Sequence, residues 1–321
     1  MSRKLIFGIY PGGTSGTEAG LTIAKPDNAI LVNDALAKLQ GSHSLFLVRC
    51  YTSFGSANEW TPANPLQYVN NGRKMDLVVG YQSKDGDVEG WIDFIRNIIN
   101  QYGRYLAKVQ ITEEPNLHNI PVVDGDYPRV REAVVEGVIA AKEVIRKIGL
   151  SIEVGFNAVP TFDPANDFWR EIGRLATPAF YESLDYVGLD FFPDVFRPVA
   201  LDELKEAVWF VLNHFRYTSM AEANIPFTIP IHITENGWAT SPERSAEKQA
   251  KVLECVIRAI HEYQIEMNVT HYELFGLRDA DSQNPNIFHQ FGIMQDDYLP
   301  KPAFAMYQRL IAELGNRDIS L

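Results

Sequence analysis

Two glutamates stand at the ends of strand-like segments far apart in the chain, Glu114 in the run ITEEPN and Glu235 in the run ITENGW. Two facing carboxyl groups can cleave a glycosidic bond, because one protonates the leaving oxygen while the other, ionised, attacks the anomeric carbon. Arg49 could hold the second group ionised and so separate the two pKa values. We therefore expect Glu114 as acid/base and Glu235 as nucleophile, with retention if the carboxyls lie about 5–5.5 Å apart.

Other polar and aromatic residues at the ends of strand-like segments are expected to bind the substrate. A sugar offers hydroxyl groups for hydrogen bonds and apolar ring faces for stacking on aromatic side chains. The expected substrate-binding residues are Arg49, Glu113, Asn157, Asp190, Trp238 and Tyr272. Structural alternatives exist for most of them: Arg49 and Glu113 could be partners in ion pairs, and Asp190 could be a solvated acid. Trp238 and Tyr272 could be packing side chains.

The elements that must position these residues alternate regularly along the chain. Short runs rich in β-branched and apolar residues cover residues 4–10, 44–51, 75–81, 108–112, 152–158, 184–192, 230–234 and 269–275. Segments with helical spacing lie at residues 28–39, 64–71, 90–105, 129–148, 166–175, 201–220, 246–263 and 303–314. Apolar strands separated by helices are typical of a parallel sheet covered by those helices.

Eight such units predict an α/β fold, a single-domain (β/α)8 TIM barrel over residues 1–321. The sequence shows no linker, low-complexity segment or short repeat that would divide the chain. In this fold the active site lies at the carboxyl ends of the strands, where both glutamates are expected.

The motifs at these positions resemble the clan A retaining glycoside hydrolases, which are (β/α)8 barrels. The run Ile233-Thr234-Glu235-Asn236-Gly237 is similar to the nucleophile motif of the β-glucosidase family. Glu114-Pro115-Asn116 resembles the end of the acid/base motif, and Arg49 matches the arginine of the second strand. The run from Gly188 to Pro193 is similar to the sixth-strand signature of the endo-galactanases. The resemblance implies an O-glycosyl hydrolase that needs no cofactor.

Three positions depart from the family pattern. Glu113 replaces the asparagine that bonds the sugar 2-hydroxyl, and its charge would raise the pKa of Glu114 or favour a substrate with a cationic amino group. Phe192 replaces a tyrosine that touches the nucleophile, so one hydrogen bond to Glu235 is expected to be lost. Tyr272 stands where the family commonly has a tryptophan platform.

The overall charge limits the possible partners. The chain has 41 acidic and 29 basic residues, a formal charge of −12, which disfavours nucleic acid and anionic membrane surfaces. No apolar stretch approaches the length of a membrane span, and no signal peptide is recognisable, so we expect a cytoplasmic protein acting on a small carbohydrate. The oligomeric state is left open.

Two other classes remain as alternatives. A catalytically inactive carbohydrate-binding barrel is suggested by Glu113 and Phe192, and a metal-dependent barrel enzyme would use Glu114, Asp190 and Glu235 as oxygen ligands. No ligand spacing specific to a metal is visible, and no metal site is expected. Strand alternation places His232 opposite to Glu235, in the layer between strands and helices, as a satisfied core histidine.

Overall fold

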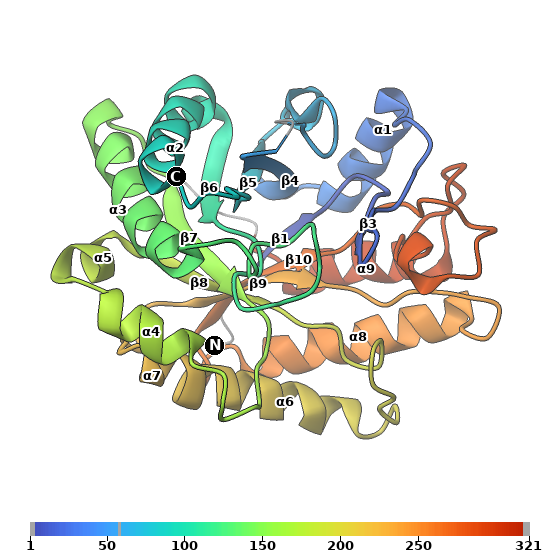
Figure 1. The fold of residues 1–321 in the computed structure, drawn as a ribbon. Helices are drawn as coiled ribbons and strands as arrows, with labels where there is room; N and C mark the ends of the chain where they lie inside the picture. Colours follow the sequence, from blue (N-terminus) through green and yellow to red (C-terminus); the bar gives the residue numbers. More distant parts are fainter. Residues whose placement is uncertain (1–3, 57–58, 317–321) are drawn as a thin grey trace.

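A closed barrel of parallel strands forms the centre of the molecule in this computed structural model, which describes residues 4–56 and 59–316 (Figure 1). The order around the barrel is β1, β10, β9, β8, β7, β6, β5 and β4, and β4 closes on β1. The strands are β1 Ile6–Ile9, β4 Phe46–Phe54, β5 Arg73–Tyr81, β6 Leu106–Ile111, β7 Glu153–Ala158, β8 Tyr186–Asp190, β9 Ile231–Asn236 and β10 Val269–Leu274. The predicted eight-stranded TIM barrel is confirmed.

Helices surround this barrel and cover its outer face (Figure 1). They are α1 Ala29–Gln40, α2 Val88–Tyr102, α3 Val130–Ile148, α4 Phe168–Leu175, α5 Pro178–Ser183, α6 Leu204–His214, α7 Met220–Glu222, α8 Ala246–Tyr263 and α9 Pro302–Leu314. A small hairpin, β2 Gly16–Thr17 and β3 Gly20–Leu21, lies in the loop after β1. Within the described residues, no helix is both long and apolar enough to cross a membrane.

The sequence explains where several of these helices begin and end. The Asn28 side chain accepts hydrogen bonds from the first amides of α1, and Ser245 caps α8 in the same way. Helix α3 ends at Gly149, whose φ of 68° is readily adopted only by a residue without a side chain. The apolar faces of the helices and strands then form one continuous core.

The segment predicted as a helix at residues 64–71 is different. It forms only a short 3-10 helix, Pro65–Tyr68. Asn71 and Gly72 follow with positive φ angles of 52° and 86°, which reverse the chain before an α-helix can develop. The connection between β4 and β5 therefore has no α-helix in the described part of the chain.

An irregularity in β9 changes which side chains face the barrel interior. Leu189 of β8 pairs with Ile233, but Asp190 pairs with Glu235, so Thr234 is an extra residue. The hydroxyl of Thr234 bonds Asp190 at 2.5 Å, while the Glu235 carboxylate contacts Arg49, so two successive side chains point inward.

This bulge overturns the expectation for His232. Its ring stacks on the Tyr186 ring with centroids 4.1 Å apart. The ammonium of Lys108 also contacts Tyr186 and lies 4.8 Å from the centroid of that ring. Lys108 in turn contacts Glu273 and lies within the barrel. The prediction that His232 faces the helices was wrong, because simple alternation cannot be carried across an inserted residue.

Candidate active site

The candidate site lies at the carboxyl ends of the barrel strands, where four neighbouring strands and one further strand contribute polar side chains. Arg49 and Tyr51 come from β4, Glu113 and Glu114 follow β6, Asn157 is near the end of β7, Asp190 ends β8, and Glu235 is near the end of β9. Of the predicted site residues, six are therefore brought to one end of the barrel: Arg49, Glu113, Glu114, Asn157, Asp190 and Glu235. Parallel strands place their carboxyl ends together, which is why residues so distant in sequence meet here.

Glu235 is held by two side chains of β4. The Tyr51 hydroxyl donates to Glu235 Oε1 at 2.5 Å, and Arg49 Nε lies 3.4 Å from the same oxygen. Glu235 is only 7% exposed, so these contacts act with little competition from water. The other carboxylate oxygen, Oε2, receives neither of these bonds and has no hydrogen bond to another residue in the part of the chain that the structure describes.

Tyr51 is a site residue that the sequence reasoning missed. It stands two positions after Arg49 on the same strand, and that spacing puts both side chains on one face. Its hydroxyl also accepts from Arg49 Nε at 2.8 Å. The hydrogen bond expected to be missing because of Phe192 is thus supplied to Glu235 from the opposite side of the barrel.

Arg49 is buried behind the carboxylates rather than exposed to a substrate. It is 1% exposed, and its guanidinium reaches Asp76 at 2.5 Å and Gln110 at 3.0 Å besides its contacts with Tyr51 and Glu235. A buried arginine with all its edges engaged fixes its neighbours in place. Both interpretations of Arg49 in the sequence place it beside a carboxylate, and the structure places it beside Asp76 and Glu235.

The backbone after β6 is held in an unusual conformation. Thr112 and Glu114 have φ angles of 69° and 44°, which side-chain-bearing residues rarely adopt. Asp124 clamps the residue between them: its Oδ2 accepts from the amide of Glu113 at 2.7 Å, and its own amide donates to the Glu113 carbonyl at 2.8 Å. The amide of Glu114 donates to Asn157 Oδ1 at 2.8 Å. Such strain persists only where surrounding contacts hold it.

The side chains of Glu113 and Glu114 have different partners. Glu113 Oε2 accepts from Gln110 at 2.7 Å and from Asn157 at 3.3 Å, and Arg49 Nη2 lies 3.6 Å away. The Glu114 carboxyl, in contrast, has no hydrogen bond to any residue in the described ranges 4–56 and 59–316. Glu113 is therefore committed to the protein, while Glu114 is free to bond a ligand.

Burial raises the pKa of several of these carboxyls. The pKa of Glu114 lies well above its usual range because of burial, and the charges of Asp190 and Glu235 add to the effect. The pKa of Glu113 is raised in the same way, by burial first and then by Glu235. Burial, followed by the charge of Glu235, raises the pKa of Asp190 to about 7. The site thus favours protonated carboxyls around Glu235.

Asp190 and Asn157 are fully buried and support the neighbouring carboxyls. Asn157 donates to Asp190, and Thr234 donates to the other Asp190 oxygen. Carboxylate oxygens of Glu113, Glu114 and Asp190 lie within 4.8 Å of one another, so this group could hold an oxygen-preferring cation such as Mg²⁺ or Ca²⁺. Two of the three ligands expected for the metal-dependent alternative, Glu114 and Asp190, belong to this group.

The structure does not bring Trp238 and Tyr272 into this site. Trp238 is fully buried, its indole N–H donates to Asp194, and the Arg244 guanidinium covers its ring at 3.8 Å. Tyr272 is also fully buried, and its hydroxyl donates to Asn236 Oδ1 at 2.6 Å. Neither ring has an exposed face on which a sugar could stack.

Other aromatic side chains adjoin the carboxylates. Tyr10 contacts the Tyr51 ring at 5.4 Å and stacks on Phe275 at 5.1 Å, and Phe192 meets Phe275 edge to face at 6.3 Å. Phe192 and Phe275 are partly exposed, and Phe196 beyond them is 59% exposed. The aromatic surface is therefore formed by Phe275, which directly follows β10, and not by Tyr272.

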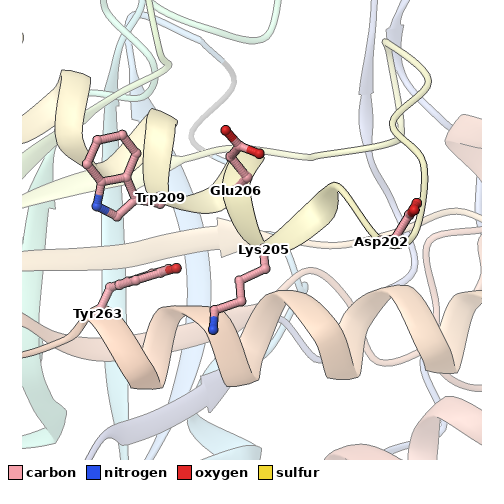
Figure 2. Close-up of a pocket in the computed structure, with 5 residues that line it drawn as sticks. All are labelled: Asp202, Lys205, Glu206, Trp209 and Tyr263. Atoms are coloured by element: carbon pink, nitrogen blue, oxygen red, sulfur yellow. The ribbon is translucent and has the colours of Figure 1, made fainter.

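A hollow of about 440 Å³ lies elsewhere, on the outer wall of the barrel, between α6 and the end of α8 (Figure 2). Its lining residues are Asp202, Lys205, Glu206, Trp209 and Tyr263. In the close-up, Lys205 extends from α6 toward α8, where it pairs with Glu262 at 2.7 Å. This hollow contains none of the predicted site residues.

No protein-family model matches the sequence, and no match was found among curated protein sequences. Solved structures of the same fold include the family 1 β-glucosidase of Exiguobacterium antarcticum B7, with 13% identity, a TM-score of 0.62, and coverage of 98% of this chain and 99% of that one. The family 1 β-glucosidase of Thermotoga maritima has 11% identity and a TM-score of 0.62, covering 98% and 100% of the two chains.

A family 39 glycoside hydrolase from Bacteroides cellulosilyticus WH2 is similar over 98% of this chain and 64% of its own, with 12% identity and a TM-score of 0.60. At such identities the likeness establishes the fold. The resemblance noticed in the sequence is thus confirmed for the barrel architecture that these glycosidases share.

Proposed function

We propose that this chain is a retaining glycoside hydrolase in which Glu235 is the nucleophile and Glu114 the acid/base. The observation that carries the proposal is the contrast between the two carboxyls. Glu235 accepts hydrogen bonds from Tyr51 and Arg49, which hold its carboxylate in place, whereas Glu114 has no such partners among the described residues and an elevated pKa. The fold likeness to β-glucosidases and a family 39 hydrolase supports the same chemistry.

In the first step, Glu235 Oε2 attacks the anomeric carbon while Glu114 donates its proton to the glycosidic oxygen. The carbon–oxygen bond breaks, the alcohol leaves, and a glycosyl ester forms on Glu235. Tyr51 and Arg49 keep Oε1 fixed, so the attacking oxygen is held in one orientation.

In the second step, the ionised Glu114 accepts a proton from water as the water oxygen attacks the anomeric carbon. The ester bond breaks and releases Glu235 as a carboxylate. Ester formation has meanwhile removed the negative charge of Glu235, which is one cause of the raised pKa of Glu114. The pKa of Glu114 therefore falls when the group must act as a base.

The substrate that we propose is a small oligosaccharide or glycoside. The partly exposed rings of Phe192 and Phe275 next to the carboxylates offer stacking surface for a sugar ring. The alternative of an inactive carbohydrate-binding barrel was suggested by Glu113 and Phe192. It loses the second of these supporting observations, because Tyr51 bonds Glu235 in place of the missing tyrosine.

The direct genetic test replaces Glu235. Glu235→Gln should abolish hydrolysis of an activated aryl glycoside, and azide should restore turnover of Glu235→Gly with formation of the glycosyl azide of inverted configuration. Glu243→Gln, at an exposed position, is the matched control and should keep full activity. Full activity in Glu235→Gln would eliminate the proposal.

A further inference from the structure

A second cluster of polar side chains lies at the opposite, amino-terminal end of the barrel. Glu153 is the first residue of β7, His271 lies near the start of β10, and His232 is the second residue of β9. One donor atom from each of these three residues can be chosen so that all lie within 4.8 Å of one another. This cluster shares no residue with the candidate active site.

His232 is the unusual member of the cluster. Its side chain is fully buried, and neither ring nitrogen has a hydrogen-bond partner among the described residues. A buried imidazole with unpaired nitrogens is destabilising unless another group satisfies them.

His271 and Glu153 already approach each other. His271 Nδ1 lies 2.9 Å from the Thr270 hydroxyl, which orients the ring, and its Nε2 lies 3.6 Å from Glu153 Oε2. Two ligands of one zinc ion, each about 2.0–2.1 Å from the metal, are separated by a similar distance. A hydrogen-bonded second nitrogen is the usual arrangement for a histidine ligand.

A hollow of about 420 Å³ reaches two members of this cluster from the surface. Glu153 and His271 line it, together with Lys108 and residues of the α3 end such as Lys142 and Arg146. The Glu153 side chain is 46% exposed, so this member of the cluster is open to an ion and a water molecule from the solvent. The nearby ammonium of Lys108 faces the carboxylate of Asp76 at 3.5 Å, which offsets its positive charge.

We propose that Glu153, His232 and His271 form a binding site for a divalent transition-metal ion, with Zn²⁺ as the best-suited ion. Two imidazoles and a carboxylate are ligands that Zn²⁺ accepts, and water from the hollow supplies the fourth position. The His232 and His271 rings, now 3.7 Å apart with a 33° tilt, must open to direct their nitrogens at one ion. The amino-terminal face of such barrels serves stability, so the ion would stabilise the fold.

The test uses Co²⁺ and Zn²⁺ with the purified full chain treated with chelator. We expect one Co²⁺ per chain with the visible absorption of a four-coordinate, nitrogen-ligated site, displaced by Zn²⁺, and a higher Tm with either ion. Glu153→Gln and His271→Asn should each raise the Kd for Co²⁺ by about tenfold or more. Because Glu153 is partly exposed, Glu153→Gln should fold normally and carries the test even if a histidine variant does not.

Two control variants separate this site from others. His118→Asn removes an exposed histidine, and Glu114→Gln removes a carboxylate from the acidic group at the other end of the barrel. Both should bind Co²⁺ as the unchanged protein does. Absence of binding, a six-coordinate spectrum, or weakened binding in Glu114→Gln but not in Glu153→Gln would overturn the proposal.

Discussion

At the scale of single residues, the site depends on how each carboxyl is partnered. Glu235 receives a hydroxyl and a guanidinium, Glu113 receives two side-chain amides, and Glu114 is left without a partner among the described residues. These differences in bonding are the basis for the distinct roles that we propose for residues of one chemical type. The bonds that Glu113 accepts from Gln110 and Asn157 fit a residue that holds the site together. They do not fit a solvated charge at the rim of the barrel.

Removing the Tyr51 hydroxyl should slow the chemical step. A hydrogen bond to a charged group contributes about 1.5–3 kcal/mol, so Tyr51→Phe should lower kcat/KM on an aryl glycoside by about 10- to 150-fold. Tyr10→Phe is the matched control, since Tyr10 contacts the Tyr51 ring but bonds Thr14 at 2.6 Å. Equal losses in both variants would argue against a specific role of Tyr51.

The proton donor can be identified from the pH dependence of kcat/KM. Because the pKa of Glu114 is raised, the group keeps its proton to a higher pH than an ordinary glutamate, and activity should fall as pH rises through that pKa. Glu114→Gln should lose this alkaline limb and should lose about 10²- to 10⁴-fold more activity on poor than on good leaving groups. Glu113→Gln should keep the limb; its disappearance in that variant alone would assign the proton to Glu113.

At the scale of elements, β9 and the connection from β6 to α3 shape the site. The bulge at Thr234 lets Thr234 and Glu235 both point into the barrel, one toward Asp190 and the other toward Arg49. Alternation within β9 alone cannot reveal this, because a bulge depends on the pairing with β8 and β10. That is why the environment of His232 was mispredicted, while Glu235 itself was correctly placed on the barrel face by its motif and strand end.

Asp124 should be a structural clamp for the segment that carries the proposed acid/base, Glu114. Its Oδ2 accepts from the buried amides of Tyr81 and Glu113, both at 2.7 Å, so Asp124→Ala leaves two donors unpaired. Each unpaired donor costs about 1–3 kcal/mol, and urea unfolding should show a loss of this order together with reduced kcat.

The control for this change is Asp126→Ala in the same loop. Asp126 also accepts from a backbone amide, that of Asn119 at 2.6 Å, but its side chain is 51% exposed. Water can replace that contact, so the stability of Asp126→Ala should fall by less. A loss as large as that of Asp124→Ala would show that burial of the clamp is not the cause.

At the scale of the whole molecule, charged side chains in the barrel interior connect its two ends. Between the candidate active site and the histidine pair, Asp76 forms ion pairs with Arg49 and Lys108, and Lys108 also contacts Glu273. The regular spacing of apolar segments was enough to predict the barrel, because that pattern depends on local sequence. Contacts such as Tyr51 with Glu235, and the burial of Trp238 and Tyr272, depend on neighbours far along the chain and could not be predicted in this way.

The buried Glu273 should make stability depend on pH. Burial, with the charge of Asp76 adding to it, raises the pKa of Glu273 to about 8. The folded state then keeps a proton that the unfolded chain releases at about pH 4. The stability that Glu273 contributes is therefore fully present below about pH 4 and is lost as the pH rises through the pKa of the folded state. In urea unfolding, Glu273→Gln should show a flatter decline of stability toward alkaline pH than Glu243→Gln; identical slopes would contradict this.

The central claim is the covalent role of Glu235, and a mechanism-based trap tests it most directly. The protein is incubated with activated 2-fluoro glycosides, its intact mass is measured, and the labelled peptide is sequenced by mass spectrometry. We predict one glycosyl group per chain, attached to Glu235 in the ITENGW segment, with loss of activity in proportion to labelling. Hydrolysis of the parent glycosides without any label on Glu235, or with the label on another carboxylate, would contradict the account.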